Sequence, residues 1–399
     1  MTPRTLAAHL FQTHARVRRN PLRPATCRHE AVTAEVRELV KRGEAFLSLR
    51  DAGASIEGRP IRIISFGKGP TTILLWTQMH GDEPTATLAF LDILGILTGP
   101  GGRESWAKEI LARTTVHAIP MLNPDGAERA RRLNAAGIDI NRDALALVSP
   151  EARILREAQR QLRPDYAFNL HDQPLASAGP VPRVTALSLL SPACDEKRST
   201  PPVRLRAMKV GALVVNVLRP FVAGHLATYD DSFLPRAFGD AMQSWGTSTL
   251  LVESGHWPKD PEKRLVRRLN VAGILAAMHA IGSGTVERTS PRSYLRLPQN
   301  GKMLFDVLVR NVTLRVRSPG WTGTVDVGLA ADPPRHTRAD PSAPVLVRVE
   351  EIGDLGAFGG LAVLDARGRS LPTAAVTVGG VLPLTRIEEA IRLPRPRGR

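Results

Sequence analysis

Apolar runs bounded by turn residues recur along most of the chain and predict alternating strands and helices. Residues 59–79 contain two such runs around a Gly-Pro turn, and the second run, at 71–79, is apolar on both faces. A run that is apolar throughout is typical of a strand buried in the middle of a sheet. Further apolar strands are expected at 114–122, 165–171 and 248–255.

Four segments around these strands have the pattern of helices. Residues 31–49 and 261–282 are amphipathic, and residues 84–97 form an apolar segment that begins with proline. The segment at 149–162 begins with Ser149, a suitable N-cap, and has proline at the first helical position. Strands that alternate with helices predict an α/β fold with a mostly parallel, mixed central sheet flanked by helices.

The composition changes near residue 284, where short β-rich runs separated by Gly, Pro and Asp turns replace the alternation. We therefore expect a larger domain at residues 31–284 and a small all-β domain at residues 285–390. The two ends of the chain, residues 1–30 and 391–399, are rich in arginine and are interpreted as a basic extension and a basic tail.

Charge and cysteine content narrow the functional classes. The 399 residues carry a formal net charge of +16, but only 5% of them are aromatic. Since no nucleic-acid-binding motif accompanies the charge, we interpret it as solvated ends and expect no specific nucleic-acid partner. The two cysteines, Cys27 and Cys194, allow at most one disulfide and no thiolate metal site.

No apolar run approaches the roughly 18 residues of a membrane span. The N-terminus is a poor secretory signal, so a cytoplasmic location is expected.

Two potential metal ligands, His80 and Glu83, directly follow the apolar run at 71–79. Open α/β sheets build their sites at the carboxyl ends of parallel strands. An imidazole and a carboxylate suit Zn²⁺, and catalytic zinc usually has three protein ligands. His171, at the end of the strand at 165–171, is the candidate third ligand. Taken singly, each of these residues is explained as well by an ordinary turn or by a position at the edge of the core as by metal binding.

Other strand-end and loop residues could serve a metal-dependent hydrolase. Glu253 ends an apolar strand, where a carboxylate is costly unless it is paired or functional, and it is a candidate general base. The loop at 120–143 contains Arg132, Asn141 and Arg142. Guanidinium groups match carboxylates with two parallel hydrogen bonds, so these residues could bind a substrate carboxylate. Composition alone favours ordinary loop arginines.

The motifs occur in one order: HxxE at 80–83, NPDG at 123–126, an arginine nine residues before the Asn of DINR, and the strand-end residues His171 and Glu253. In this order they resemble the zinc metallocarboxypeptidases, the carboxypeptidase A-like family, over about residues 45–283. The resemblance implies that His80, Glu83 and His171 bind one zinc ion.

The resemblance also implies the roles of the remaining residues. Glu253 would activate water and later protonate the leaving amine, and Arg132 would polarise the scissile carbonyl. Asn141 and Arg142 would bind the terminal carboxylate of the substrate. Tyr229, 24 residues before Glu253, is either the tyrosine that caps the substrate in the family or a loop tyrosine without a role. We expect the residues that recognise the substrate side chain between about 225 and 248.

Three functions remain open from the sequence. The first is a zinc metallocarboxypeptidase that cleaves a C-terminal peptide bond by means of zinc-activated water. The second is a zinc amidohydrolase acting on N-acyl amino acids or cell-wall muropeptides. The third is a non-catalytic binding protein that uses the basic surface. The first two need a peptide or an N-acyl amino acid with a free carboxylate, and the sequence leaves the side-chain preference and the oligomeric state open.

The C-terminal domain resembles the small β-sandwich that flanks the barrel of metal-dependent amidohydrolases. The resemblance rests on segments such as 305–316, 345–355 and 362–375, and the barrel with its metal motifs is missing. The one histidine of this domain, His336, lies in a polar loop. We therefore interpret the domain as a structural or positioning appendage.

Overall fold

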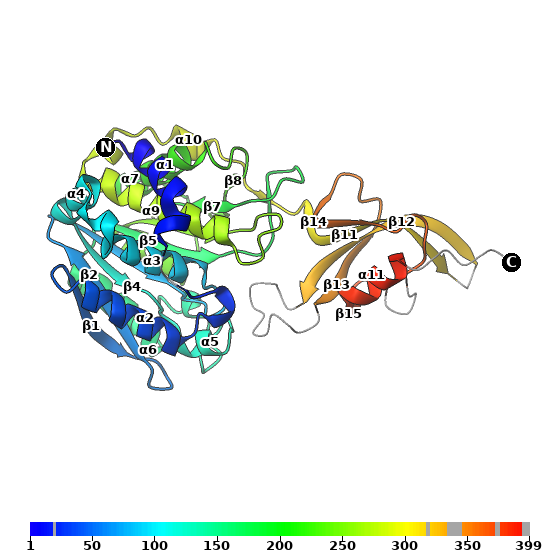
Figure 1. Ribbon diagram of the computed structural model, residues 1–399, viewed down its shortest axis with the longest axis horizontal. Helices are drawn as coiled ribbons and strands as arrows, with labels where there is room; N and C mark the ends of the chain where they lie inside the picture. The colour runs from blue at the N-terminus through cyan, green and yellow to red at the C-terminus, as the bar shows by residue number, and fades with distance from the viewer. Residues whose placement is uncertain (19–20, 317–319, 333–344, 372–375, 393–399) are drawn as a thin grey trace.

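The computed structural model describes residues 1–18, 21–316, 320–332, 345–371 and 376–392. Figure 1 shows a larger α/β domain and, beside it, an elongated domain built on a separate sheet. Residues 393–399 of the expected basic tail, and His336, lie outside the described residues. Among the residues described, no helix combines the length and the apolar character needed to cross a membrane.

An eight-stranded mixed sheet forms the centre of the larger domain, with the strand order β1-β2-β4-β3-β5-β9-β7-β8. Neighbours from β4 to β9 are parallel, whereas β1, β2 and the β7–β9 pair are antiparallel. This confirms the predicted α/β class. The strands are β1 (Leu47–Ala54), β2 (Pro60–Gly67), β3 (Thr71–Thr77), β4 (Thr114–Ile119), β5 (Tyr166–Asp172), β7 (Leu187–Leu190), β8 (Leu226–Thr228) and β9 (Ser248–Ser254).

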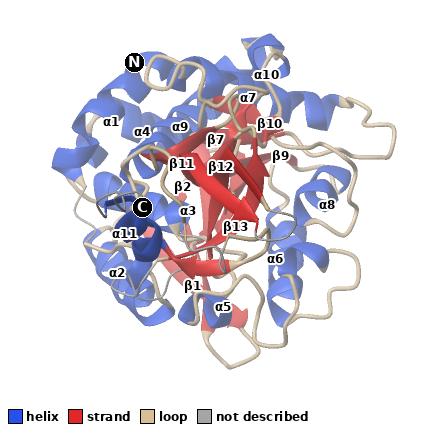
Figure 2. Ribbon diagram, turned by 90° about the vertical axis from the view of Figure 1, so that its right-hand side faces the viewer, coloured by secondary structure: helices blue, strands red, loops and turns tan. Residues whose placement is uncertain are grey.

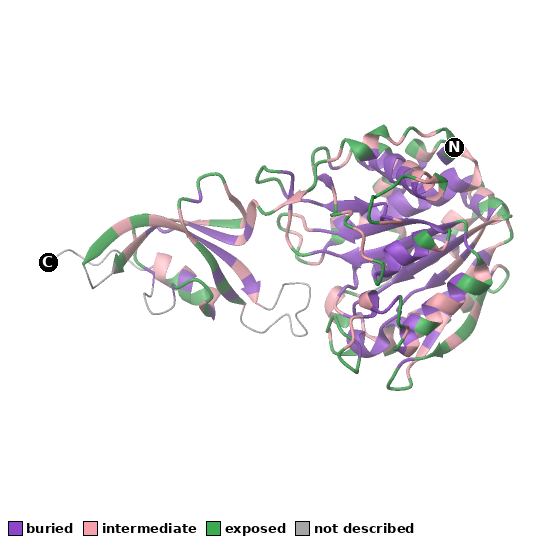
Figure 3. Ribbon diagram, turned by 180° about the vertical axis from the view of Figure 1, so that it is seen from behind, coloured by how far each residue is buried: buried purple, intermediate pink, exposed green. Residues whose placement is uncertain are grey.

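Helices cover both faces of this sheet, as Figure 2 shows. One face packs against α2, α3, α4, α7 and α9, and the other packs against α6 and α8. Because both faces are covered, all residues of β5 and β9 are buried, and buried residues gather in the centre of the larger domain (Figure 3). The helices are α1 (Pro3–Val17), α2 (His29–Arg42), α3 (Thr85–Leu97), α4 (Ser105–Arg113), α5 (Pro124–Glu128), α6 (Pro150–Leu162), α7 (Pro202–Leu218), α8 (Phe238–Ser244), α9 (Arg264–Gly282) and α10 (Arg292–Leu295).

The N-terminal residues differ from the basic extension that we expected at 1–30. Residues 3–17 form α1, which packs against α9 and buries Leu6, Leu10 and His14. Leu6 and Leu10 are four residues apart and therefore lie on one face of the helix, while the arginines lie on the exposed remainder. Helix α2 also ends at Arg42, earlier than the predicted residue 49, because Leu47 begins the edge strand β1.

The C-terminal domain has one five-stranded sheet in the order β14-β11-β12-β13-β15. Its strands are β11 (Leu304–Val316), β12 (Trp321–Asp332), β13 (Leu346–Gly353), β14 (Gly359–Asp365) and β15 (Val381–Pro383). Where we expected a sandwich of two sheets, helix α11 (Leu384–Arg392) packs Ile387 against this sheet. The short strands β6 (Ser177–Ala178) and β10 (Asn300–Gly301) pair with each other and join the two domains.

Candidate active site

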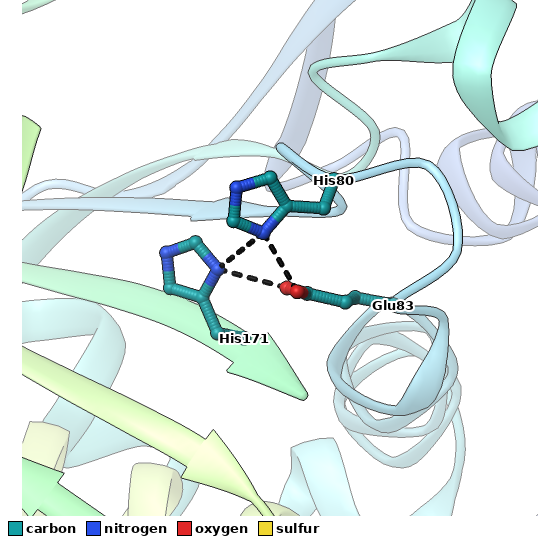
Figure 4. A group of neighbouring side chains, drawn as sticks. All are labelled: His80, Glu83 and His171. Carbon is teal, nitrogen blue, oxygen red and sulfur yellow. Dashed lines mark hydrogen bonds and ion pairs between the residues drawn. The ribbon is translucent and has the colours of Figure 1, made fainter. Parts of the chain in front are cut away.

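Three buried side chains converge at the carboxyl edge of the central sheet (Figure 4). His80 and Glu83 lie in the turn between β3 and α3, and His171 lies near the end of β5. The two oxygens of Glu83 lie 2.7 Å from His80 Nδ1 and 2.8 Å from His171 Nδ1, and the two nitrogens are 3.2 Å apart. Two imidazole nitrogens and a carboxylate facing one point form a donor set that fits Zn²⁺ with a further coordination position open.

The protonation of the three side chains supports this fit. Burial alone would lower the pKa of His80, but Glu83 and Asp139 raise it to about 9. Burial would likewise raise the pKa of Glu83, yet the two histidines hold it well below its usual range. The negative charge of Glu83 therefore persists in the protein interior only with positive charge beside it, which a proton or a divalent cation supplies.

Asp139 orients the first histidine and was not among the predicted residues. Its Oδ1 lies 3.2 Å from His80 Nε2, on the side of the ring opposite Glu83. Its Oδ2 accepts hydrogen bonds from Arg132 Nε at 3.2 Å and Nη2 at 3.0 Å. A carboxylate on the second nitrogen of a metal-binding histidine fixes its tautomer and ring orientation. The position of Asp139 two residues before Asn141 is the signal that could have identified it.

Glu253 lies at the end of β9, directly opposite His171 in the register of β5 and β9. The residue is only 9% exposed, and burial, together with the carboxylate of Glu83, raises the pKa of Glu253 to about 8. Its Oε2 has no hydrogen-bond partner among the described residues. A carboxylate with a pKa near neutral and a free oxygen is suited to exchange a proton with a bound substrate or water.

The predicted carboxylate-binding residues lie on the loop beside the three ligands. Arg132 Nη1 is 3.2 Å from His80 Nδ1 and 3.4 Å from Glu83 Oε1, so its guanidinium faces the ligands. Asn141 Oδ1 accepts a hydrogen bond of 2.9 Å from the backbone N–H of Phe238, which ties the loop to the start of α8. Arg142 Nη1 donates to the backbone oxygen of Asn141 at 2.8 Å.

Tyr229 follows β8 and remains 38% exposed at the rim of the site. Burial of its ring and the negative charge of Glu253 raise the pKa of the Tyr229 hydroxyl, which places the phenol within electrostatic range of that carboxylate. Two residues further on, Asp231 accepts hydrogen bonds from Arg198 and the buried Arg204, so this loop is anchored to the domain.

A buried ion pair is formed by residues adjacent in sequence to the site residues, and it was also not predicted. Lys263 Nζ donates to Asp172 Oδ2 at 3.2 Å and to the backbone oxygen of Ser254 at 3.1 Å. Asp172 also accepts a 2.6 Å hydrogen bond from Thr85 Oγ1. These three partners are next to His171, Glu253 and the helix start that follows Glu83, so one lysine connects the three backbone segments of the site.

Known proteins are similar to part of this chain. Residues 32–165 match the family model for zinc carboxypeptidases. This segment is therefore similar to the zinc carboxypeptidases. Carboxypeptidase 2 of Trichophyton rubrum is 27% identical over 156 residues, which cover 36% of this chain and 28% of that protein. Carboxypeptidase E of Caenorhabditis elegans is 29% identical over 130 residues, 28% of each chain. The chain thus spans less than a third of the length of these two relatives.

Solved structures share the fold of the larger domain. A metallo-carboxypeptidase from Burkholderia cenocepacia superposes with a TM-score of 0.52 at 19% identity, over 64% of this chain and 69% of that one. The family match ends at residue 165, so it includes His80 and Glu83 but neither His171 nor Glu253. Strands β5 and β9 bring the last two residues to the matched segment.

Proposed function

We propose that the protein is a zinc-dependent metallocarboxypeptidase that hydrolyses the C-terminal peptide bond of its substrate. The convergence of His80, Glu83 and His171 beside the carboxylate of Glu253 is the observation that carries this proposal. Zinc bound by the three residues would polarise the scissile carbonyl and lower the pKa of water. The relatives named carboxypeptidase, and the family model, support the same reaction class.

Side chains of the protein carry out proton transfer and stabilise the carbonyl oxygen. Glu253 accepts a proton from the attacking water as the bond from oxygen to the carbonyl carbon forms. It then passes that proton to the leaving nitrogen as the C–N bond breaks, which releases a shortened peptide and a free amino acid. Arg132 donates hydrogen bonds to the carbonyl oxygen as this oxygen gains negative charge.

Substrate positioning falls to the loop residues. Asn141 and Arg142 bind the terminal carboxylate, and because this group exists only at the end of a peptide, they place the last peptide bond at the metal. Tyr229 closes over the substrate from the rim. In this scheme a substrate that lacks the free carboxylate is cleaved poorly, because its reacting carbonyl is not held in place.

Steady-state hydrolysis of an acylated dipeptide tests the proposal. We expect a chelator to abolish turnover, added zinc to restore it, and Glu253→Gln to lower kcat at least 100-fold, in the range of lost general-base catalysis. Glu157→Gln, on α6 with a side chain that is 46% exposed, is the matched control and should retain full activity. Full activity after zinc removal or in Glu253→Gln would falsify the mechanism. An N-acyl amino acid and a muropeptide, assayed in parallel, separate the two zinc-hydrolase alternatives.

A further inference from the structure

A cavity of about 420 Å³ lies between the two domains. Its volume is within the range of about 300–1,000 Å³ found for ligand sites, which form preferentially where domains meet. The larger domain contributes Pro174, Leu175 and His256 to the lining. The C-terminal domain contributes apolar residues of β11 and β12 together with four charged side chains. The cavity is therefore built by both domains and by neither alone.

The cavity adjoins the ends of the two strands that carry the candidate active site. Pro174 follows His171 by three residues, and three residues of chain span at most about 11 Å. His256 follows Glu253 by the same number of residues. The wall that the larger domain contributes therefore begins beside the candidate catalytic residues.

Hydrogen bonds hold the start of the C-terminal domain against the same strand ends. Asn300 in β10 donates from its Nδ2 to Gln173 Oε1 at 2.8 Å, and its Oδ1 accepts from Ser188 Oγ at 2.9 Å. Gln173 comes two residues after His171. Ser188 is opposite Glu253 in the register of β7 and β9. The junction of the domains is thus attached to the edge of the sheet that carries the site.

The C-terminal domain gives the cavity a negative charge. Glu350 and Glu351 both line it, although successive residues of a regular strand point to opposite faces. A β-bulge explains this, because the register with β12 passes from Val349 to Glu351 and leaves Glu350 as the extra residue. Asp306 adds a third carboxylate, against one lysine, Lys302. Carboxylates thus predominate at this place in a chain whose net charge is +16.

Apolar side chains share the lining with the carboxylates. Leu175, Leu304 and Phe305 supply this apolar surface. Lysine and arginine side chains match such a lining, because their methylene groups cover apolar surface while the charged head reaches a carboxylate. An anionic group would instead be repelled by the carboxylates, and a wholly apolar group would leave them without a counter-charge.

We propose that this cavity binds a lysine or arginine side chain of the substrate, a few residues before the scissile bond. The inference rests on the proposed carboxypeptidase function and gives the C-terminal domain a part in substrate selection. In that function the last peptide bond lies at the metal, so the rest of the peptide extends away from it, and the cavity adjoins the ends of β5 and β9. An extended peptide advances about 3.3 Å per residue, so three or four residues reach from the ligands to the cavity wall.

Acylated hexapeptides with identical last two residues test the selection. Each carries lysine, methionine or glutamate at one position, from the third to the sixth counted from the C-terminus. At the position that reaches the cavity, kcat/KM should be about fivefold higher for lysine than for methionine, as partly exposed ion pairs allow, and lowest for glutamate. Glu350→Gln combined with Glu351→Gln should abolish the difference between lysine and methionine. An acylated dipeptide is too short to reach the cavity, so this double variant should cleave it at the unchanged rate.

The matched control is Glu388→Gln combined with Glu389→Gln. It also removes two successive glutamates of the C-terminal domain, on α11 outside the cavity lining, and should leave the lysine preference unchanged. Charge reversal in Glu351→Lys should move the preference to glutamate, a change that a merely structural role does not produce. Equal kcat/KM for lysine and methionine at all four positions overturns the inference and leaves the function intact. A preference that survives the loss of Glu350 and Glu351, or that the control also loses, does the same.

Binding separates this inference from the proposed function. Calorimetric titration of the hexapeptides into Glu253→Gln, with and without the changes at Glu350 and Glu351, measures the preference without turnover. Both glutamates are exposed, so their replacement by glutamine should not prevent folding. Tighter binding of the lysine peptide that is lost with the two carboxylates supports the inference even if no peptide is hydrolysed, a result that would refute only the function. Peptides that are hydrolysed but bind equally whatever their charge overturn the inference alone.

Discussion

Replacement of Lys263 by methionine would remove the positive charge that compensates Asp172 in the interior. The two side chains are 5% and 0% exposed, and their charged atoms are 3.2 Å apart. Removal of one partner of a buried ion pair typically costs about 3–5 kcal/mol, because the other charge is left uncompensated. Asp172 keeps its hydrogen bond from Thr85, so we expect a loss of about 3 kcal/mol, at the lower end of that range.

A double-mutant cycle separates the pair from its surroundings. Asp172→Asn alone should also destabilise the protein, because it leaves the lysine charge without its carboxylate. The double variant, Lys263→Met with Asp172→Asn, carries no buried charge at this position and should lose less than the sum of the single changes. We expect a coupling free energy of about 2–3 kcal/mol, within the range measured for residues in direct contact.

Urea unfolding of the chelator-treated protein is the appropriate assay, because metal binding would otherwise add its own stabilisation. Fluorescence of the buried Trp76 and Trp106 follows the larger domain, and the midpoint and slope give the free energy of unfolding. Single variants that each lose less than about 1 kcal/mol, with effects that add to within about 0.5 kcal/mol, would show that the pair does not hold the segments together.

Three further experiments test other parts of the structure. Deletion of residues 1–17 should lower the free energy of unfolding by more than about 3 kcal/mol, since α1 buries Leu10 and its neighbours; an unchanged melting temperature would contradict this. Burial raises the pKa of Asp240 to about 6, so the folded protein must bury a charge as the pH rises above that value. Asp240→Asn should therefore stabilise the protein at pH 8 by about 1–2 kcal/mol but not at pH 4, and equal gains at both values would exclude this cause. Burial also raises the pKa of the Cys27 thiol to about 12, so iodoacetamide at pH 8 should label Cys194 and spare Cys27 until the protein unfolds, as peptide mass spectrometry can show.

The predicted metal ligands were accessible from sequence because each lies where an apolar strand ends. The strand alone then determines that His80, His171 and Glu253 reach the same edge of a parallel sheet. The residues that contact these side chains could not be predicted in this way. Lys263 contacts Asp172 across 91 positions, and only the packing of α9 against the sheet brings the two together.

The N-terminal helix α1 was not predicted, for a different physical reason. Arginine-rich composition predicted an extension, but the four residues that α1 buries do not need a low overall charge, since arginines occupy the exposed part of the helix. The pair of His14 Nε2 and Asp92 Oδ2, 2.9 Å apart, then fixes the helix on the domain. Asp92 also accepts hydrogen bonds from Arg267 on α9, so α1, α3 and α9 meet at one buried carboxylate.

The register of β5 determines which side chains share the face of the sheet that carries the site. His171 faces Glu253, and Asn169 faces Trp76 and Leu251, because the strands pair in this register and no other. A slip by one residue would turn all these side chains to the opposite face. That face is apolar and packs Phe168 and Leu170 against the helices, so a slip would bury His171 and Asn169 there and expel the apolar pair. The packing that excludes this slip therefore keeps His171 and Glu253 together on the face of the sheet that carries the site.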